Sequence, residues 1–182
     1  SLIQYFANVR MKNKKKAIVC VSNDLITDNR VARTCVVLEN ENYEVLLVGR
    51  KKRNSPVMNQ RNYRWKRFKL PFEKGPLFYL TLNLRIFLFL LVRKVDLIYA
   101  NDLDTLAPCY FVSKIKNTRL IYDTHELFTE VPELTSRPKI QNIWLKIEST
   151  IFPKLKQVIT VNDSIAKIYM QKYNVAVTTV RN

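Results

Sequence analysis

The sequence predicts an α/β fold: a single Rossmann-like domain with a doubly wound parallel sheet, strand order about 3-2-1-4-5-6, and helices on both faces. Short apolar segments alternate with segments of helical periodicity along the chain. Most of the apolar segments lack the alternation of a half-exposed sheet, which is typical of parallel strands covered on both faces. Right-handed crossovers then favour double winding. With 182 residues, 47% of them hydrophobic, the chain is long enough for one such core.

Seven segments are predicted as strands. The first, 17–22, reads Ala-Ile-Val-Cys-Val-Ser, and the second, 45–48, is closed by Gly49. The third, 64–70, is basic and aromatic, and it is predicted only from the alternation of its side chains. The remaining four are short apolar segments bounded by polar residues, as buried strands are; they cover residues 95–100, 119–122, 158–161 and 176–180.

The first two predicted helices follow the first and third strands. Asp28 is positioned to cap the first helix, which ends near Asn42. Its apolar face consists of Val31, Cys35 and Leu38. The second helix, 76–93, is almost entirely apolar. The polar residues within its apolar part are Thr81, Asn83 and Arg85.

Three further helices are predicted in the second half of the chain. The helix 105–116 tolerates Pro108 in its first turn. Pro138 opens the next helix, and Asp163 or Ser164 caps the last one. Their apolar faces are formed by Ile140, Ile143, Trp144, Ile147 and Ile151 in the former, and by Ile165, Ile168 and Tyr169 in the latter.

The residue composition excludes several classes of site. With only two glycines, Gly49 and Gly75, neither G-x-G-x-x-G nor G-x-x-x-x-G-K-[ST] can be written, so a Gly-rich phosphate loop is excluded. The single histidine, His125, excludes an H-E-x-x-H zinc site, and we expect no metal to be bound. The three cysteines have no C-x-x-C spacing and are predicted to be reduced, buried thiols; they are Cys20, Cys35 and Cys109.

The net charge of +16 is concentrated in residues 50–74, which carry ten Lys or Arg and one acidic residue. This block suits a solvated loop, an anionic membrane surface, or nucleic acid, with the interspersed aromatic residues stacking on bases. We favour the membrane surface, because an apolar segment too short to span a bilayer, 76–92, follows directly. The predicted membrane-surface residues are Arg50, Lys51, Lys52, Arg53, Arg64, Lys66, Arg67 and Lys69.

The N-terminal 16 residues are predicted to form a basic tail that precedes the domain, which is expected to cover residues 17–182. Met11 is followed by a run of lysines, which is typical of a natural bacterial start. We therefore expect residues 1–10 to be upstream or foreign sequence.

Polar side chains follow four of the predicted strands at their C-terminal ends, where ligands bind in an open parallel sheet. They are Asn23 and Asp24, Asp102 and Asp104, Asp123, His125 and Glu126, and Asn162. Helix capping explains part of this pattern, because Asn, Asp, Ser and Thr are preferred N-caps. Capping accounts for Asp104 or Thr105, but it does not explain Asp123, which precedes no predicted helix.

The segment 123–134 is predicted to be a long acidic and aromatic loop that contains the only imidazole. Loops of this length at a strand end are usually functional when they are ordered. His125 can exchange a proton or bind a hydroxyl group near neutral pH. It is therefore the candidate catalytic residue.

Several motifs together resemble a known family. They are Asp28-x-Arg30, VDLIYANDLDTL at 95–106, LIYDTHELFTEVPEL at 120–134, Trp144 with Glu148, VITVNDSIA at 158–166, and VRN at 180–182. This set resembles bacterial retaining glycosyltransferases of family 4, and more narrowly the N-terminal, acceptor-side domain of their GT-B architecture. The most specific part is the stretch around His125, which follows A-x-D-x-D-T-L.

The resemblance implies two Rossmann-like domains that face each other across a cleft. The N-terminal domain would bind a glycan or lipid-linked acceptor, and the C-terminal domain would bind a nucleotide sugar through an E-x7-E pair. Transfer would retain the anomeric configuration and need no metal. His125 matches the family histidine beside the transferred sugar. The residues expected to bind acceptor or substrate are Asn23, Asp24, Arg30, Asp102, Asp123, Glu126 and Asn162.

The sequence departs from the family pattern in two respects. Many members have a Gly-Gly turn where this chain has Asn23 and Asp24. The E-x7-E half is also absent, so we expect these 182 residues to bind no cofactor and to be inactive alone.

The predicted function is sugar transfer in bacterial surface polysaccharide synthesis, at the cytoplasmic face of the cell membrane. The alternative is a stand-alone basic α/β module that binds nucleic acid. Asp102-Leu103-Asp104 also matches the D-x-D metal motif of GT-A glycosyltransferases, although regular strand–helix alternation argues against that architecture.

Overall fold

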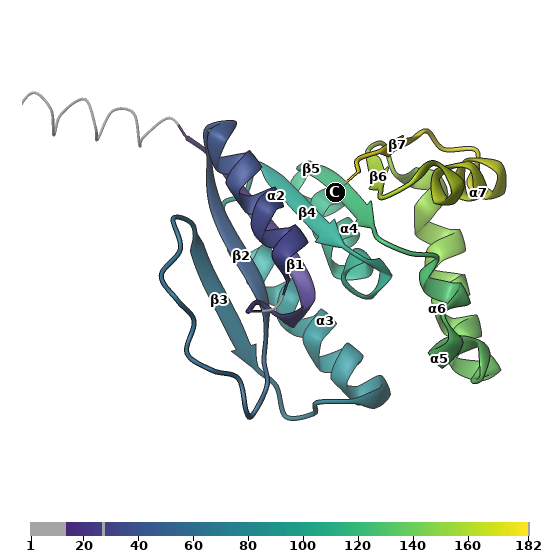
Figure 1. Ribbon diagram of the computed structural model, residues 1–182, viewed down its shortest axis with the longest axis horizontal. Helices are drawn as coiled ribbons and strands as arrows, with labels where there is room; N and C mark the ends of the chain where they lie inside the picture. The colour runs from purple at the N-terminus through teal and green to yellow at the C-terminus, as the bar shows by residue number, and fades with distance from the viewer. Residues whose placement is uncertain (1–13, 27, 182) are drawn as a thin grey trace, which may run out of the picture.

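A computed structural model describes residues 14–26 and 28–181. Its strands form one parallel seven-stranded sheet in the order β3-β2-β1-β4-β5-β6-β7 (Figure 1). The predicted fold class and strand order are confirmed, and β7 adds an edge strand beside β6. The strands are β1 (Lys15–Asp24), β2 (Tyr43–Lys51), β3 (Arg64–Lys69), β4 (Leu97–Asn101), β5 (Arg119–Thr124), β6 (Val158–Thr160) and β7 (Val177–Thr179). Most of the predicted tail, residues 1–13, lies outside the described residues.

Helices cover both faces of the sheet (Figure 1). The helix α2 (Asn29–Asn40) packs on one face, and α3 (Gly75–Leu91), α4 (Leu103–Lys116) and α6 (Pro138–Ile151) pack on the other. The short elements η1 (Phe128–Glu130), α5 (Pro132–Thr135) and η2 (Phe152–Lys154) and the helix α7 (Asp163–Tyr173) complete the chain. Neighbouring residues of β1 alternate between the two cores, which is why this strand is apolar on both sides.

Four strands, β1, β2, β4 and β5, extend beyond their predicted C-terminal ends. Gly49 lies inside β2 rather than closing it. A Cβ atom at this position would lie 2.7 Å from the carbonyl oxygen of Asn23, so glycine allows the end of β1 to approach β2 closely. Asp123 and Thr124 belong to β5 and not to the following loop. Much of the predicted loop 123–134 is therefore a strand end followed by the helical turns η1 and α5.

The helix caps match the prediction in part. The side chain of Asp28 accepts a hydrogen bond from the Val31 amide and caps α2, as expected. Asn162 caps α7, in place of the predicted Asp163 or Ser164. The helix α4 begins at Leu103, so Asp104 and Thr105 lie inside its first turn and the capping prediction for both was wrong.

The buried faces of α6 and α7 also differ from the prediction. In α6 the buried residues are Trp144, Glu148 and Ile151, whereas Ile143 is 59% exposed. In α7 Ile168 is exposed. Periodicity alone missed the buried carboxylate, because Glu148 becomes stable inside only through hydrogen-bond donors that α7 supplies.

A proline inside α4 has a specific partner. Pro108 lacks the amide that would bond to the carbonyl of Asp104. The side-chain amide of Asn83, on α3, donates to that carbonyl at 2.8 Å. Asn83 thus satisfies a backbone group that the proline leaves open, which explains a polar residue on the apolar helix α3.

The three cysteines, Cys20, Cys35 and Cys109, are free and buried, as predicted. The helix α3 has 17 residues. Among the described residues, no helix has both the length and the apolar character needed to cross a bilayer.

Candidate functional site

The candidate site lies at the C-terminal edge of the sheet, where the strand order reverses. From β1 the chain proceeds to β2 on one side, and from β4 it proceeds to β5 on the other. In open α/β sheets, this switch point forms the ligand-binding crevice. Five polar side chains from separate elements gather there: Arg30, Tyr99, Asp102, Asp123 and His125.

The carboxylate of Asp123 is the centre of this cluster and is only 1% exposed. Arg30 donates to its Oδ1 atom at 2.8 Å, and the hydroxyl of Tyr99 donates to its Oδ2 atom at 2.8 Å. A buried carboxylate without such partners would lose its hydration at a cost of several kcal/mol. These charge-assisted bonds join the first turn of α2 to β4 and β5.

His125 lies between two carboxylates. Its backbone amide donates to Oδ1 of Asp102 at 3.1 Å, and its Nδ1 atom is 3.4 Å from Oδ2 of the same residue. Its Nε2 atom is 3.5 Å from Oδ2 of Asp123. This second contact is an ion pair and lacks the geometry of a hydrogen bond. The side chain is 24% exposed, so one edge of the ring reaches the surface of the site.

Asp102 has a strained backbone, with φ 59° and ψ 166°. This conformation is essentially restricted to glycine and costs about 1–3 kcal/mol elsewhere. Hydrogen bonds hold it: the Asp102 amide donates to the carbonyl of Asp123 at 2.9 Å, and its side chain accepts from His125. The strain places the Asp102 carboxylate beside the imidazole, a pattern found at functional sites.

The environment shifts the pKa of Asp123, His125 and Asp102. Burial acts to raise the pKa of Asp123, but His125 and Arg30 outweigh it and leave that pKa below its ordinary value. Burial acts to lower the pKa of His125, but the two carboxylates outweigh it, so the pKa lies above its ordinary value. The pKa of Asp102 is raised, mainly by burial.

The charge state decides what the cluster can do chemically. With both ring nitrogens facing carboxylates and a raised pKa, the His125 side chain is stabilised as an imidazolium. Such a ring is a poor general base, but it can stabilise negative charge that develops nearby. The arrangement suits charge stabilisation beside an anionic or hydroxyl-bearing ligand.

Comparison with known proteins decides the family. The profile of Glycosyltransferase Family 4 matches residues 27–182. The chain belongs to glycosyltransferase family 4. No curated protein matches the sequence.

Solved structures are similar to this family 4 domain in fold. Sucrose-phosphate synthase from Thermosynechococcus elongatus matches 92% of the chain at 14% identity, with a TM-score of 0.69. A glycosyltransferase from Rickettsia africae ESF-5 matches 93% at 15% identity, with a TM-score of 0.58. The matches cover 48% and 43% of those two chains, so this chain spans about half their length.

Asp104 does not pair with Asp102 as a metal ligand would. Its side chain is 5% exposed, and its buried Oδ1 atom has no hydrogen-bond partner among the described residues. Burial, followed by the charge of Asp102, raises the pKa of Asp104 to about 7. In the described part of the family 4 domain, no group of three or more His, Cys, Asp or Glu side chains is placed to hold a metal ion.

The carboxylate of Asp24, a predicted acceptor-binding residue, is hydrogen-bonded to other groups of the same domain. Its carboxylate accepts hydrogen bonds from the hydroxyl of Ser55, from the amide of Lys52 at 3.4 Å and from Arg67 at 3.3 Å. Burial acts to raise the pKa of Asp24, but these bonds outweigh it and lower the pKa. The pair of Asp24 and Arg67 is 9% and 7% exposed and anchors the segment between β2 and β3.

The basic block is therefore not one uniform surface. Arg67 is buried against Asp24, Arg50 donates to the carbonyl of Glu73 and covers the ring of Phe78, and Arg64 pairs with Glu44. Lys51 is half-buried. The block residues that remain exposed, and that form no ion pair within the described part of the chain, are Lys52, Arg53, Lys66 and Lys69.

The other predicted site residues have separate positions. Asn23 and Glu126 are exposed at the same edge of the sheet as His125, whereas the side chain of Asn162 is engaged as the cap of α7. Sequence reasoning missed Tyr99. Its position within an apolar strand indicates a core residue, and only the approach of β5 gives its hydroxyl a carboxylate partner.

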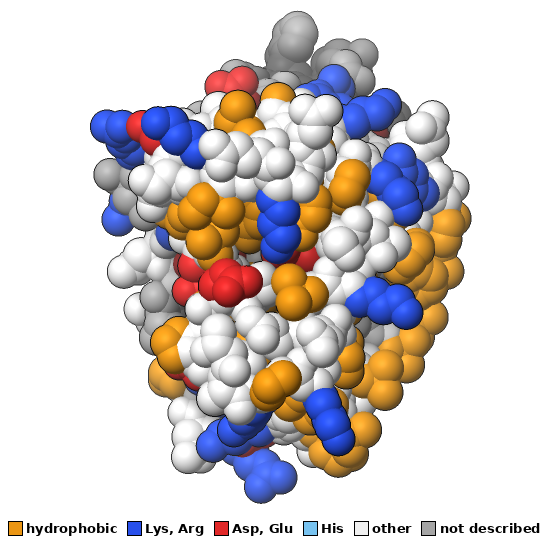
Figure 2. Space-filling model, turned by 90° about the vertical axis from the view of Figure 1, so that its right-hand side faces the viewer, with side chains coloured by type: hydrophobic (Ala, Val, Ile, Leu, Met, Phe, Trp, Pro, Cys, Tyr) orange, Lys and Arg blue, Asp and Glu red, His pale blue; other side chains and the backbone are white. Residues whose placement is uncertain are grey.

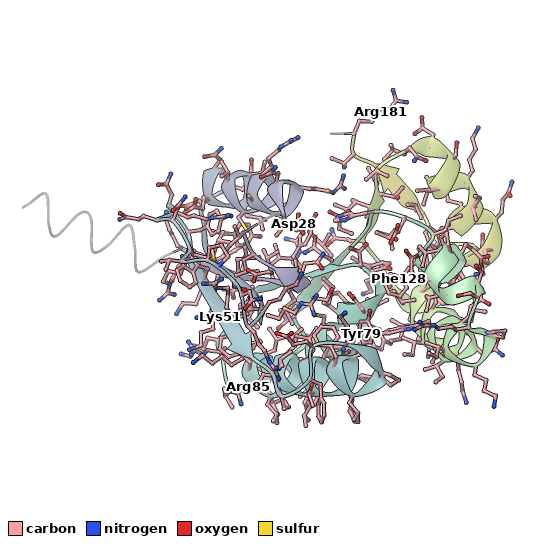
Figure 3. All side chains as sticks on the ribbon, turned by 60° about the horizontal axis from the view of Figure 1, so that its bottom comes forward. Asp28, Lys51, Tyr79, Arg85, Phe128 and Arg181 are labelled. Atoms are coloured by element: carbon pink, nitrogen blue, oxygen red, sulfur yellow. The ribbon has the colours of Figure 1, made fainter. Side chains whose placement is uncertain are left out.

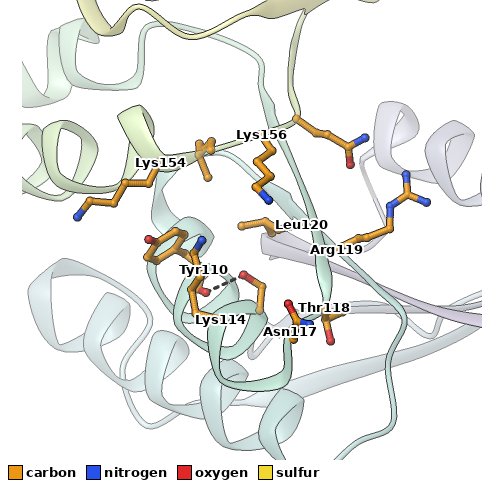
Figure 4. Close-up of a pocket in the computed structure, with 11 residues that line it drawn as sticks. Tyr110, Lys114, Asn117, Thr118, Arg119, Leu120, Lys154 and Lys156 are labelled. Atoms are coloured by element: carbon orange, nitrogen blue, oxygen red, sulfur yellow. Dashed lines mark hydrogen bonds between the residues drawn. The ribbon is translucent and has the colours of Figure 1, made fainter.

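A cavity of about 480 Å³ lies at the opposite edge of the sheet (Figure 4). The cationic residues that line it are Lys114, Arg119, Lys154 and Lys156. It adjoins the C-terminal end of α4, where the helix dipole favours cations. This cavity is separate from the His125 cluster. Its four basic residues contribute to the net positive charge of the chain.

We expect the stability contributed by His125 to depend on pH. Because its folded-state pKa is raised, the contribution is complete below the unfolded value of about 6.5 and is lost as the pH rises through the folded-state pKa. Urea unfolding of the wild type and of His125→Gln should therefore differ more at pH 5.5 than at pH 9. A difference that grows toward pH 9 would contradict the imidazolium between Asp102 and Asp123.

Proposed function

We propose that this chain is the acceptor-side domain of a retaining glycosyltransferase of GT-B architecture. The enzyme transfers a sugar from a nucleotide sugar to a glycan or lipid-linked acceptor in bacterial surface polysaccharide synthesis. The observation that carries the proposal is the position of the His125 ring between the carboxylates of Asp102 and Asp123, at the switch point of a family 4 domain. The nucleotide sugar binds mainly to a second domain, since this chain spans about half the length of the matched structures.

In this proposal the residues have distinct roles. His125 stabilises negative charge beside the transferred sugar, and this positive charge supports transfer without a metal. Asp123 and Arg30 hold the imidazole in position. Asn23 and Glu126, exposed at the same edge, hydrogen-bond hydroxyl groups of the acceptor.

The outer face of α3 supports a peripheral position at the inner face of the cell membrane. Its side chains Leu77, Leu80, Leu84 and Leu88 are each at least half exposed. Figure 2 shows hydrophobic side chains gathered along its right-hand edge, on the α3–α4 side of the molecule. A surface helix that is apolar all round needs an apolar partner. Exposed cations near α3, among them Lys69, Lys74, Arg85 and Arg93, suit anionic head groups.

The aromatic residues favour this membrane interpretation over nucleic-acid binding. Base stacking needs free aromatic faces. In this domain Arg67 covers the ring of Trp65, and Arg61 covers the ring of Tyr63. These two rings are already stacked within the chain, which leaves fewer platforms for bases.

The test compares the two ligands directly. At ~150 mM salt, where weak charge contacts are screened, the purified chain should sediment with vesicles that contain anionic lipid. It should not retard single-stranded RNA in a gel. A Leu84→Gln, Leu88→Gln variant should lose most vesicle binding, and the matched control Ile168→Gln, Met170→Gln on α7 should retain it. RNA binding without vesicle binding would reject the membrane assignment, and sugar transfer by these 182 residues alone would reject the division of roles between two domains.

A further inference from the structure

An apolar groove of about 450 Å³ lies between α3 and the α5–α6 segment. Its lining is mostly hydrocarbon and includes Tyr79, Leu80, Leu134, Ile140, Ile143 and Trp144. The volume falls within the range of small-molecule sites, which are concave and mainly apolar with a few polar groups. Here the polar groups among the lining residues are Asn83, Glu133 and Arg137.

Aromatic contacts connect this groove to the His125 segment. The rings of Tyr79 and Trp144 are 5.1 Å apart, and those of Phe128 and Trp144 are 5.3 Å apart. Phe128 follows His125 by three residues. Figure 3 shows Tyr79 on α3 and Phe128 on the facing segment, at the same side of the domain. A molecule in the groove would therefore lie along a wall that leads toward the candidate reaction centre.

The groove is also continuous with the outer face of α3. Leu80 belongs both to the groove lining and to the exposed leucine row. Thr81 and Asn83 do not interrupt the surface, because Thr81 bonds to the carbonyls of Leu77 and Phe78, and Asn83 donates to the carbonyls of Tyr79 and Asp104. An apolar path thus extends from the face assigned to the membrane into the groove.

We propose that the groove binds the hydrocarbon chain of a lipid-linked acceptor, so that the sugar at the polar end of the acceptor reaches His125. This inference rests on the proposed function. The lipid is favoured over a protein segment because the path begins at an apolar face flanked by exposed cations. Lys74 and Arg137, both exposed near the start of α3 and α6, would neutralise a phosphate that links chain and sugar.

The experiment uses the two tryptophans of the chain. Trp65→Phe leaves Trp144, in the groove wall, as the only tryptophan, whose emission is excited selectively over that of tyrosine. A brominated alkyl phosphate, used below its micelle concentration, should quench Trp144, whereas inorganic phosphate should not. Unbrominated alkyl phosphate and an isoprenyl phosphate then compete for the same site, and the stronger competitor identifies the kind of chain.

Groove variants give the decisive comparison. Leu80→Gln and Ile143→Gln, both at exposed positions, should each weaken the probe about tenfold, because an amide meets the chain without a partner. Ile168→Gln on α7 should leave binding unchanged. Absent quenching, or quenching that the groove variants do not weaken, would overturn the inference, as would self-association that these variants abolish.

A kinetic experiment distinguishes failure of the groove inference from failure of the proposed function. In an enzyme with both domains, the groove variants should raise KM for a lipid-linked acceptor but not for a short water-soluble one. Loss of the groove inference leaves transfer to the soluble acceptor intact. Loss of the proposed function removes transfer to both, while quenching of Trp144 persists.

Discussion

Replacing His125 with alanine should lower the turnover of the enzyme that contains this domain by about 10²–10³-fold, the usual effect of removing a preorganised charge-stabilising group. The imidazole is 24% exposed and lies between two carboxylates that raise its pKa, whereas the guanidinium of Arg30 is directed at Asp123. Turnover is measured at saturating nucleotide sugar and acceptor, with Lys139→Ala, exposed on α6, as a matched control.

The pH profile separates this role from general base catalysis. If the imidazolium acts through its charge, turnover falls as the pH rises through the raised pKa of His125. A general base would give the opposite slope, with turnover rising over the same range. Turnover that His125→Ala leaves unchanged, with the domain still folded, would remove His125 from the reaction centre.

Replacing Glu148 with alanine should destabilise the domain by about 3–5 kcal/mol, a large share of the stability of a small domain. The carboxylate is fully buried and accepts hydrogen bonds from Tyr173 at 2.5 Å, Lys172 at 2.9 Å and Tyr169 at 3.4 Å. Alanine removes the acceptor of all three donors and leaves a cavity between α6 and α7.

Urea unfolding measures this change, and Ser149→Ala on the exposed face of α6 is the control, with an expected effect within about 0.5 kcal/mol. Tyr169 also donates to the carbonyl of Glu126, beside His125. We therefore expect Glu148→Ala to loosen the segment after β5 as well, seen as faster amide exchange there. A variant as stable as the wild type would show that the network is replaced by water.

The order of strands and helices could be read from the sequence because it depends on local patterns. The apolar segments of β1 and β4 and the periodic helices α2 and α6 bury their side chains wherever the sheet places them. The same reasoning located His125, Asp102 and Asp123, since parallel strands bring their C-terminal ends to one edge. Exact strand ends were less accurate: Thr124, for example, belongs to β5 through its pairing with β6.

The hydrogen-bond partner of a polar side chain could not be predicted from the sequence in this way. Asp24 and Arg67 were assigned to an acceptor and to a membrane, yet they bond to each other across 43 positions of sequence. Tyr99 was missed for the same reason, since its acceptor, Asp123, lies on another strand. In each case the partner of the polar side chain lies on a distant segment, which the sequence alone does not place.

The sequence by itself determined the fold class, the chain's positive charge and the edge of the sheet that carries the candidate site, because periodicity and strand direction are local properties. Tertiary structure alone decided which charges are free. It enclosed Asp24 with Arg67 and Glu148 with two tyrosines, left the leucine row of α3 exposed, and held His125 between two carboxylates. The physical reason is that burying a charge is favourable only beside a complementary group, and distant segments supply that group.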